Sequence, residues 1–317
     1  MSQPKVLLLD EIQDDTVNVM NEAVPGVEFI DARTTEVRDE HLPTAEIIYG
    51  FLPLDQYDKA TSLKWLQLLS AGVPRRLCPI AKNKNFIVTN LAGLYGPSIA
   101  EHTVTVMSML CRNLHIAMQN QFRSTWDATI NKTMRDLSGQ TAAIIGLGDI
   151  GRNIARMCKN FGMRVVGTRR RPQPTPFVDQ VYAANDLQPM LAEADFVIVA
   201  TALTPETTDL LGTEEFGWMK KGVFFVNVSR GAVAQESVLL EALRSGHVAG
   251  AALDVFLEEP LPADHPYWQM PNVIVTPHYC GDTVNNSTMP MQRFLRNLRS
   301  WLAGEDLEYV VDLDSGY

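Results

Sequence analysis

The sequence predicts an α/β fold of two domains, each built on a doubly wound parallel sheet. The chain has 317 residues, enough for two domains of about 150 residues each, and 46% of its residues are hydrophobic, ample for two packed cores. Short apolar runs of strand length alternate with helical or polar segments, as is typical of parallel sheets. A glycine triplet at Gly146, Gly148 and Gly151 stands where one such run meets a helical pattern.

The first hundred residues predict a small parallel sheet. Its expected strands are Lys5 to Leu9, Val27 to Ile30, Glu46 to Tyr49, Trp65 to Leu69 and Phe86 to Thr89. Ligands of open α/β sheets bind at the carboxyl ends of strands, so the segments Phe51 to Leu54 and Ser70 to Pro74 are candidate binding loops. The second reads SAGVP, and its proline suits a first helical position with backbone N–H groups facing an anion. A surface turn explains the same residues equally well.

The next segment predicts one long helix, from Pro97 to Leu114, that is apolar after Glu101 and His102. Apolar residues on most of its faces indicate burial between domains or between subunits. A polar, irregular segment from Trp126 to Ser138 follows.

A βαβ unit is predicted from Thr141 to Arg169. Ala142 to Ile145 has strand length, the apolar residues behind the glycines recur at helical spacing, and Arg164 to Gly167 forms the second strand. A unit of this length with this glycine turn predicts a Rossmann-type dinucleotide-binding domain.

Each glycine of the turn has a separate physical role. Gly146 permits the tight turn, Gly148 lets a pyrophosphate approach the backbone, and Gly151 lets the helix pack close to the strand. The N-terminus of the following helix offers unpaired N–H groups and the positive end of its dipole to the phosphates. Asp149 and Ile150 are therefore expected cofactor contacts.

The remaining strands complete this second sheet. They are expected at Phe196 to Ala200, Val223 to Val228, Val248 to Leu253 and Val273 to Thr276, with helices at Glu214 to Lys220 and Gln235 to Ser245. The final helix, Asn286 to Trp301, follows the sheet and is expected to return to the first domain. We therefore expect a discontinuous substrate-binding domain, residues 1–98 and 286–317, and a dinucleotide-binding domain, residues 99–285.

Three charged or titratable residues follow strands of the second sheet. Arg230 lies in NVSRG, Glu259 in DVFLEEP and His278 in TPH. Singly they are explained as a solvated arginine, a loop glutamate and an ordinary histidine. Their joint placement at the carboxyl ends of dinucleotide-domain strands indicates a reaction site beside the reactive ring of a cofactor.

Composition limits the partners. A net charge of −10 argues against a nucleic-acid surface and requires local cations for any anionic ligand. The four cysteines lack C-x-x-C spacing, which favours buried reduced thiols over disulfides or a metal site and fits the cytoplasm. No apolar run approaches the roughly 18 residues of a membrane span, so no membrane association is expected.

The chain resembles the D-isomer-specific 2-hydroxyacid dehydrogenase family. The resemblance covers Leu137 to His278 through LSGQTAAIIGLGDIGR, LTPETTDLL, MKKGVFFVNVSRGAV, GAALDVFLEEPLP and PNVIVTPH. The first domain resembles the family more loosely, through LLSAGV, the Asn90 to Glu101 stretch and VVDLDSGY.

This resemblance implies residue roles. Arg230, Glu259 and His278 match the catalytic arginine, glutamate and histidine. The substrate carboxylate is expected on the backbone of Ala71, Gly72 and Val73, with Leu52, Leu94 and Tyr95 as walls of the substrate pocket. Asp254 is expected to face the nicotinamide amide, and Thr201, Ala202, Val228 and Ser229 are further expected cofactor contacts.

The implied reaction is reduction of a 2-keto acid to the D-2-hydroxy acid, and its reverse. Arg230 would grip the carboxylate and the keto oxygen, while His278 would protonate the carbonyl oxygen as hydride arrives. Glu259 would accept the other ring N–H and fix the tautomer. Glyoxylate, hydroxypyruvate and larger branched or aromatic 2-keto acids all remain open as substrates.

Two other readings remain. Some proteins resembling the family serve as nucleotide-sensing binding or corepressor proteins, and the intact catalytic set does not exclude that role. A formate-dehydrogenase-like enzyme is disfavoured, because that group pairs its histidine with a glutamine where this chain has Glu259. The chain also departs from the family pattern at Ala202, often a proline, and at Tyr279 and Cys280, where small residues are commoner.

The cofactor is predicted to be NADP(H) in preference to NAD(H). A carboxylate about 20 residues beyond the glycine turn binds the ribose of NAD, but the second strand ends VVGTRRRP, with no acid between Gly162 and Asp179. Arg169 and Arg170 stand where a 2′-phosphate would lie. A solvated turn is the alternative explanation.

A homodimer is predicted. The apolar helix Pro97 to Leu114 has more hydrophobic surface than one domain seam needs, and the family it resembles pairs subunits through the cofactor domains.

Overall fold

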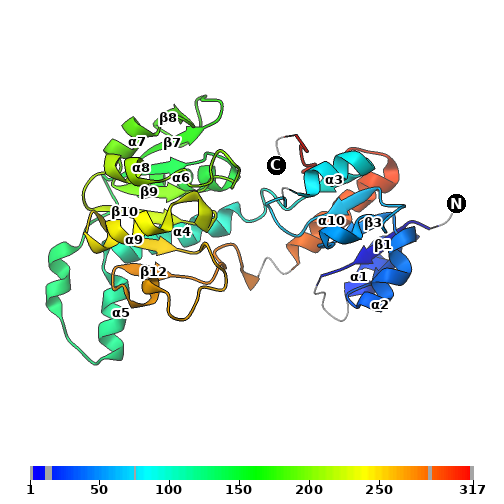
Figure 1. Cartoon of the computed structure of the whole chain (residues 1–317), viewed down its shortest axis with the longest axis horizontal. Helices are drawn as coiled ribbons and strands as arrows, with labels where there is room; N and C mark the ends of the chain where they lie inside the picture. Colours follow the sequence, from blue (N-terminus) through cyan, green and yellow to red (C-terminus); the bar gives the residue numbers. More distant parts are fainter. Residues whose placement is uncertain (1–2, 11–15, 75, 285–287, 315–317) are drawn as a thin grey trace. The chain divides into compact units, whose positions relative to one another are not determined.

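The computed structural model describes residues 3–10, 16–74, 76–284 and 288–314. The chain forms two compact units, Met1–Leu94 with Thr283–Tyr317 (unit 1) and Tyr95–Asp282 (unit 2). Both are built on all-parallel sheets (Figure 1). The predicted fold class is therefore confirmed.

Unit 1 holds a five-stranded sheet in the order β2-β1-β3-β4-β5. The strands are β1 Lys5–Leu8, β2 Glu28–Asp31, β3 Ile47–Tyr49, β4 Trp65–Gln67 and β5 Ile87–Thr89. The helices are α1 Thr16–Ala23, α2 Thr35–His41, α3 Leu77–Lys84 and α10 Met289–Ala303, with 3-10 turns η1 Leu42–Thr44 and η2 Leu54–Gln56. One core cluster joins the sheet to α3, and the other joins it to α1 and α10.

The C-terminal helix α10 belongs to unit 1, although nearly 200 residues separate it from β5. The ring of Phe294 is fully buried and lies 4.8 Å from the ring of Tyr49 and 5.2 Å from that of Trp65. Aromatic packing of this kind ties the helix to the centre of the sheet.

Unit 2 holds a seven-stranded sheet in the order β12-β11-β10-β9-β6-β7-β8. The strands are β6 Thr141–Ile145, β7 Arg164–Arg169, β8 Gln180–Ala183, β9 Phe196–Val199, β10 Val223–Asn227, β11 Val248–Leu253 and β12 Val273–Val275. Numbered within the unit, the first six strands follow the order 3-2-1-4-5-6, with β12 as an added edge. This is the Rossmann arrangement.

Helices cover both faces of this second sheet. They are α4 Gly96–Cys111, α6 Asp149–Asn160, α7 Leu187–Glu193, α8 Thr213–Trp218 and α9 Glu236–Arg244, with 3-10 turns η3 Ala128–Thr133, η4 Gly231–Val233 and η5 Pro266–Gln269. Helix α5 Leu114–Phe122 has no buried residue and extends away from the sheet (Figure 1). Residues of α4 and α6 share one core cluster with the sheet, and residues of α7, α8 and α9 share the other. In the described ranges no helix has the length and apolarity needed to cross a membrane.

The predicted single helix Pro97 to Leu114 is wrong at its end. Helix α4 stops at Cys111, Asn113 adopts a left-handed φ of 50°, and α5 begins at Leu114. The apolar residues of α4 pack with α6 and the sheet of unit 2, so its hydrophobicity is largely explained inside this unit. The exposed apolar side chains lie instead on α5.

Candidate active site

The glycine turn lies at the point where the strand order of unit 2 reverses, between β6 and β9. Gly146 has a φ of 98°, and a Cβ there would lie 2.8 Å from the Cα of Thr201. A Cβ on Gly151 would lie 2.0 Å from the carbonyl oxygen of Gly146. Both positions therefore require glycine, one for the turn and one for close packing of α6 on the strand.

The start of α6 leaves room for a pyrophosphate. Gly148 is its N-cap residue, and a Cβ placed there would meet open space. The first N–H groups of a helix have no partner within the helix, so those of Asp149 and Ile150 face this space. The Asp149 carboxylate points elsewhere: a Cβ on Gly96 of α4 would lie 2.4 Å from its Oδ2 atom. Only the backbone of Asp149 is therefore suited to an anion.

The ends of β9 and β10 are joined beside this turn. The Ser229 hydroxyl donates a hydrogen bond to the Thr201 carbonyl, and the Ser229 N–H donates to Asn227 Oδ1 at 3.0 Å. Val228 and Ser229 are buried, whereas Ala202 is exposed. Of these predicted cofactor contacts, Thr201 and Ala202 offer surface, and the two buried residues shape the loop.

The Arg230 loop packs directly against the loop that carries Glu259. A Cβ on Gly231 would lie 2.1 Å from the carbonyl carbon of Phe256. Arg230 Nη1 donates to the Ser229 carbonyl at 2.6 Å, and the Arg230 carbonyl accepts from Asn227 Nδ2 at 3.0 Å. The arginine side chain itself is exposed, which leaves guanidinium donors for a ligand.

Glu259 and His278 form a hydrogen-bonded pair. His278 Nδ1 lies 2.7 Å from Glu259 Oε2, while Glu259 Oε1 accepts the Phe256 N–H at 2.9 Å. The His278 side chain is 42% exposed and that of Glu259 is 35% exposed, so the other imidazole nitrogen of His278 can reach a ligand. A carboxylate at Nδ1 fixes the imidazole orientation and its tautomer.

Asp254 holds the loop that carries His278. Its carboxylate is 1% exposed and accepts from the Thr276 hydroxyl at 2.6 Å and from the N–H groups of Tyr279 and Cys280 at 3.2 and 3.1 Å. Burial and the neighbouring Asp254 carboxylate both raise the pKa of the Cys280 thiol, which makes it a poor nucleophile. Asp254 therefore acts as a clamp within unit 2, a role the sequence did not indicate.

Helix α4 supports the same loop. A Cβ on Gly281 would lie 3.3 Å from the Tyr95 ring, and the His102 ring meets the Tyr279 ring edge-on at 5.9 Å. Burial lowers the pKa of His102, and the nearby Asp254 opposes that shift. His102 lies seven residues, or two helical turns, beyond Tyr95, so both side chains are on the side of α4 that meets this loop.

The other predicted substrate residues lie in unit 1. Leu52 is 5% exposed and belongs to a core cluster, which leaves it little surface for a pocket wall; Leu94 is 7% exposed. Ala71 and Val73 are half-buried and Gly72 is exposed. The prediction that Pro74 opens a helix is wrong, because α3 begins at Leu77 with Arg76 as its N-cap residue.

Gly231→Ala is expected to lower the free energy of unfolding by about 1–3 kcal/mol, because the added methyl overlaps the Phe256 backbone. Urea denaturation checks this. Gly217→Ala, where a Cβ meets open space on α8, is the matched control and is expected to be neutral or stabilising. Equal stability changes in the two variants would contradict the close packing of the Arg230 loop.

The fold and the site define a Rossmann-type protein with an arginine and a paired glutamate and histidine at strand ends. Residues 104–280 match the D-isomer specific 2-hydroxyacid dehydrogenase, NAD binding domain. The chain belongs to the D-isomer specific 2-hydroxyacid dehydrogenase family.

Known relatives are similar along most of the chain. It is 32% identical to D-3-phosphoglycerate dehydrogenase of Methanocaldococcus jannaschii over 98% of its own length, but spans only 59% of that relative. It is 33% identical to glyoxylate reductase/hydroxypyruvate reductase of Mus musculus, over 80% of this chain and 78% of the relative.

A solved structure shares the whole fold. The D-isomer specific 2-hydroxyacid dehydrogenase of Xanthobacter autotrophicus Py2, in complex with NADPH and MES, superposes with a TM-score of 0.84 and 29% identity. The match covers 99% of this chain and 100% of that one.

Proposed function

We propose that this chain reduces a 2-keto acid to the D-2-hydroxy acid, and catalyses the reverse reaction, with NADP(H). The observation that carries this proposal is the 2.7 Å pair of His278 and Glu259, beside the Arg230 loop on a dinucleotide-type sheet. Unit 2 would bind the dinucleotide and unit 1 the acid. Membership of the family and the glyoxylate reductase/hydroxypyruvate reductase relative support a small 2-keto acid of the glyoxylate or hydroxypyruvate type, or a larger one.

The residues supply orientation and proton transfer. Reduced nicotinamide supplies the hydride when bound. The Arg230 guanidinium binds the carboxylate and the keto oxygen in parallel and so orients the carbonyl. His278 donates the proton at Nε2 to the carbonyl oxygen, because Glu259 occupies Nδ1. In the oxidation direction the same nitrogen accepts the proton from the hydroxyl.

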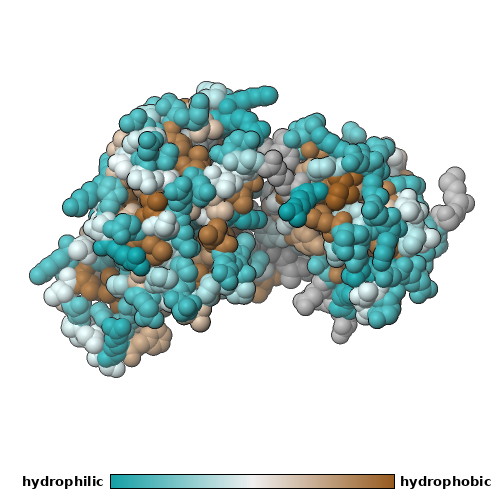
Figure 2. All heavy atoms as spheres, in the orientation of Figure 1, coloured by the Kyte–Doolittle hydropathy of each residue, from teal (hydrophilic) through white to brown (hydrophobic). Residues whose placement is uncertain are grey.

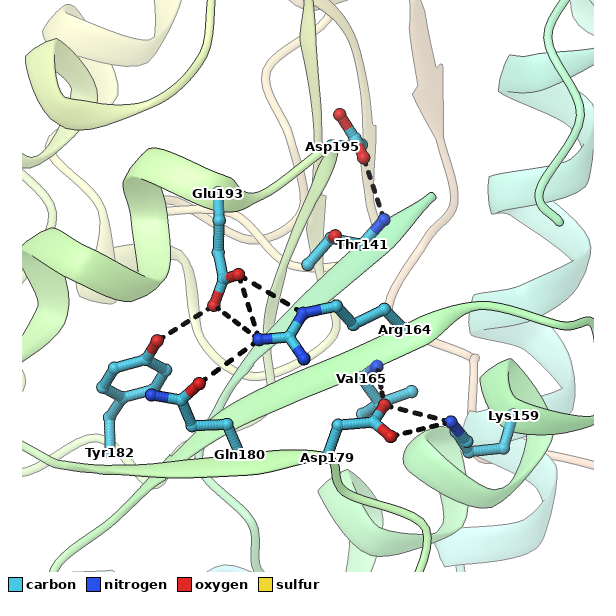
Figure 3. A network of polar contacts seen from close by, with 9 residues as sticks. All are labelled: Thr141, Lys159, Arg164, Val165, Asp179, Gln180, Tyr182, Glu193 and Asp195. Atoms are coloured by element: carbon cyan, nitrogen blue, oxygen red, sulfur yellow. Dashed lines mark hydrogen bonds and ion pairs between the residues drawn. The ribbon is translucent and has the colours of Figure 1, made fainter. Parts of the chain in front are cut away.

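The acid nearest after β7 in the sequence is already engaged, which supports the NADP(H) preference. Asp179 accepts the Val165 N–H at 2.7 Å and pairs with Lys159 at 3.0 Å (Figure 3). These contacts, the Val165 bond above all, hold the pKa of its carboxyl below the usual range. Val165 lies at the start of β7, whereas Arg169 ends that strand. Asp179 thus lies near the amino-terminal end of β7, whereas the glycine turn lies at the carboxyl ends of the strands.

The Xanthobacter relative with bound NADPH adds support for the same cofactor. In this chain Arg169 is half-buried and Arg170 is exposed, at the carboxyl end of β7, where the glycine turn also lies. Guanidinium groups bind phosphate through charge-assisted, parallel hydrogen bonds.

A 2-keto acid panel with NADPH tests the function. Glyoxylate, hydroxypyruvate, a branched and an aromatic 2-keto acid are each mixed with the protein, and loss of NADPH absorbance is followed. We expect turnover with at least one, and chiral analysis is expected to give the D-hydroxy acid from every substrate turned over except glyoxylate, whose product has no stereocentre. No turnover with any of them would overturn the proposal and favour a binding protein, whereas an L-product would overturn the assigned stereochemistry.

We expect a homodimer of twice 35.3 kDa by light scattering. The apolar face that supports it is on α5, where Leu114, Met118 and Phe122 follow one another at four-residue spacing and are 47%, 50% and 85% exposed. Figure 2 shows apolar surface in the region of this helix. An exposed apolar stripe is typical of protein interfaces.

Phe122→Asp is expected to shift the mass toward 35.3 kDa, whereas Leu302→Asp, on the exposed side of α10, is the matched control. A monomeric wild type at micromolar concentration would contradict the homodimer. A dimeric Phe122→Asp would contradict the role of α5.

A further inference from the structure

Asn90 is a buried polar residue that joins two loops of unit 1. It follows β5, is 3% exposed, and donates from Nδ2 to the Ala71 carbonyl at 2.8 Å. Its Oδ1 accepts the Ala92 N–H at 3.1 Å. The Leu91 N–H adds a bond to the Ser70 carbonyl at 3.0 Å. Hydrogen bonds therefore tie the loop after β4 to the loop after β5.

The C-terminal part of the chain holds Asn90 in place. The Arg293 guanidinium, from α10, donates to the Ala92 carbonyl and lies 4.0 Å from the centre of the Tyr309 ring. The Tyr309 carbonyl accepts the Asn90 N–H at 3.3 Å. Arg293 is 5% exposed, so this support is inside the unit. These contacts fix the backbone at Asn90 and at Ala92.

The bonds to the Ser70 to Pro74 loop set the direction of two peptide groups. In a trans peptide the C=O and the following N–H point in opposite directions. Asn90 holds the Ala71 carbonyl and so turns the Gly72 N–H away from itself. The Ser70 hydroxyl donates to the Gly72 carbonyl at 2.5 Å and turns the Val73 N–H in the same manner.

These two N–H groups are available as donors. No hydrogen bond from the Gly72 or Val73 N–H is found within the described ranges. Gly72 is exposed and Val73 is half-buried. Adjacent backbone N–H groups of fixed direction form an anion-binding site.

We propose that Asn90, assisted by Ser70, is a positioning residue that aims the Gly72 and Val73 N–H groups at the carboxylate of the substrate. This inference rests on the proposed function, because it takes the bound acid to be a 2-keto acid held by this loop. Asn90 does not touch the substrate; it acts through the peptide groups it fixes. Its contribution is preorganisation, which lowers the cost of ordering the loop on binding.

Asn90→Asp tests the proposal with little change of shape. The carboxylate keeps an acceptor for the Ala92 N–H but replaces the donor to the Ala71 carbonyl by a second acceptor. Because the loop would bind the carboxylate equally before and during reaction, KM for the 2-keto acid is expected to rise about tenfold or more with kcat within about twofold. The Kd for NADPH is expected to be unchanged.

Thr89→Val is the matched control. Thr89 precedes Asn90, is fully buried, and bonds through its hydroxyl to Trp65 Nε1 and Gln67 Oε1 at 2.8 Å each. Loss of the Thr89 hydroxyl is expected to lower the stability of unit 1. Because the hydroxyl makes no hydrogen bond to the Ser70 to Pro74 loop, KM is expected to stay within about twofold. Ser70→Ala is the second test variant and is expected to raise KM in the same direction as Asn90→Asp.

The outcomes separate the two proposals. A wild type that reduces no 2-keto acid overturns the proposed function, and this inference with it. An active wild type whose KM is unchanged in Asn90→Asp overturns the inference alone. A KM rise of equal size in Thr89→Val also overturns it, because a general loss of stability would then explain the effect.

Discussion

His278→Ala is expected to lower kcat for 2-keto acid reduction by about 10²–10⁴-fold, because the proton donor to the carbonyl oxygen is lost. NADPH binding is expected to persist, since the turn from Gly146 to Gly151 is unaltered. Steady-state kinetics and a fluorescence titration with NADPH measure the two quantities. Arg230→Ala, in contrast, is expected to raise KM for the acid as well as lower kcat, because it removes a group that binds the ground state too.

A second histidine of unit 2 provides the control. His265 Nε2 lies 3.4 Å from a Glu236 oxygen, so it has a carboxylate partner as His278 does, but it caps η5 through the Tyr267 N–H. His265→Ala is expected to keep kcat within about threefold, because the side chain lies outside the proposed catalytic set. Near-normal kcat of His278→Ala at every pH from 5 to 9, or an equal loss in His265→Ala, would contradict the assignment.

The strands that position the site were predicted within one or two residues because they are fully buried. Every residue of β6, β9 and β10 is buried, and apart from Thr141 and Asn227 at strand ends all of them are apolar. The glycine turn was equally readable, because the positive φ at Gly146 and the contact at Gly151 admit no side chain. Full burial of a strand and a backbone position that admits only glycine can both be recognised in the local sequence.

Other features leave no such signature. The edge strand β8 is only half-buried and was not predicted, nor was α7, which follows it. The break between α4 and α5 depends on the left-handed Asn113, which a helical pattern does not reveal. Leu52 was predicted as a wall of the substrate pocket, but its side chain is 5% exposed and belongs to a core cluster of unit 1.

Buried polar clamps were the hardest part of the site to predict. Asp254 was expected to face a cofactor, yet its carboxylate accepts three hydrogen bonds from the His278 loop. Asn90 was recognised only as part of a family-like stretch. Such residues are specified by partners distant in sequence, 22 to 26 residues away for Asp254, and no local period records them.

We expect the wild type to use NADPH with a higher kcat/KM than NADH, and the Arg169→Asp, Arg170→Ala double variant to lose that preference. A guanidinium–phosphate hydrogen bond contributes about 1.5–3 kcal/mol, or roughly one to two decades in kcat/KM for each arginine. The aspartate also provides an acceptor for the ribose 2′-OH of NADH. The expected change is therefore a loss with NADPH joined to a gain with NADH. Initial rates with both cofactors measure it.

The controls separate a phosphate site from a merely charged turn. Arg171 is exposed and precedes a proline, so Arg171→Ala removes one charge of the same run and is expected to change the cofactor ratio by less than about threefold. Rising ionic strength would weaken a diffuse attraction strongly but a paired contact much less. Equal use of both cofactors by the wild type would overturn the preference. An unchanged ratio in the double variant would show that Arg169 and Arg170 do not set the cofactor preference. A change of equal size in Arg171→Ala would show that the arginine run acts through its net charge and not through contacts at the end of β7.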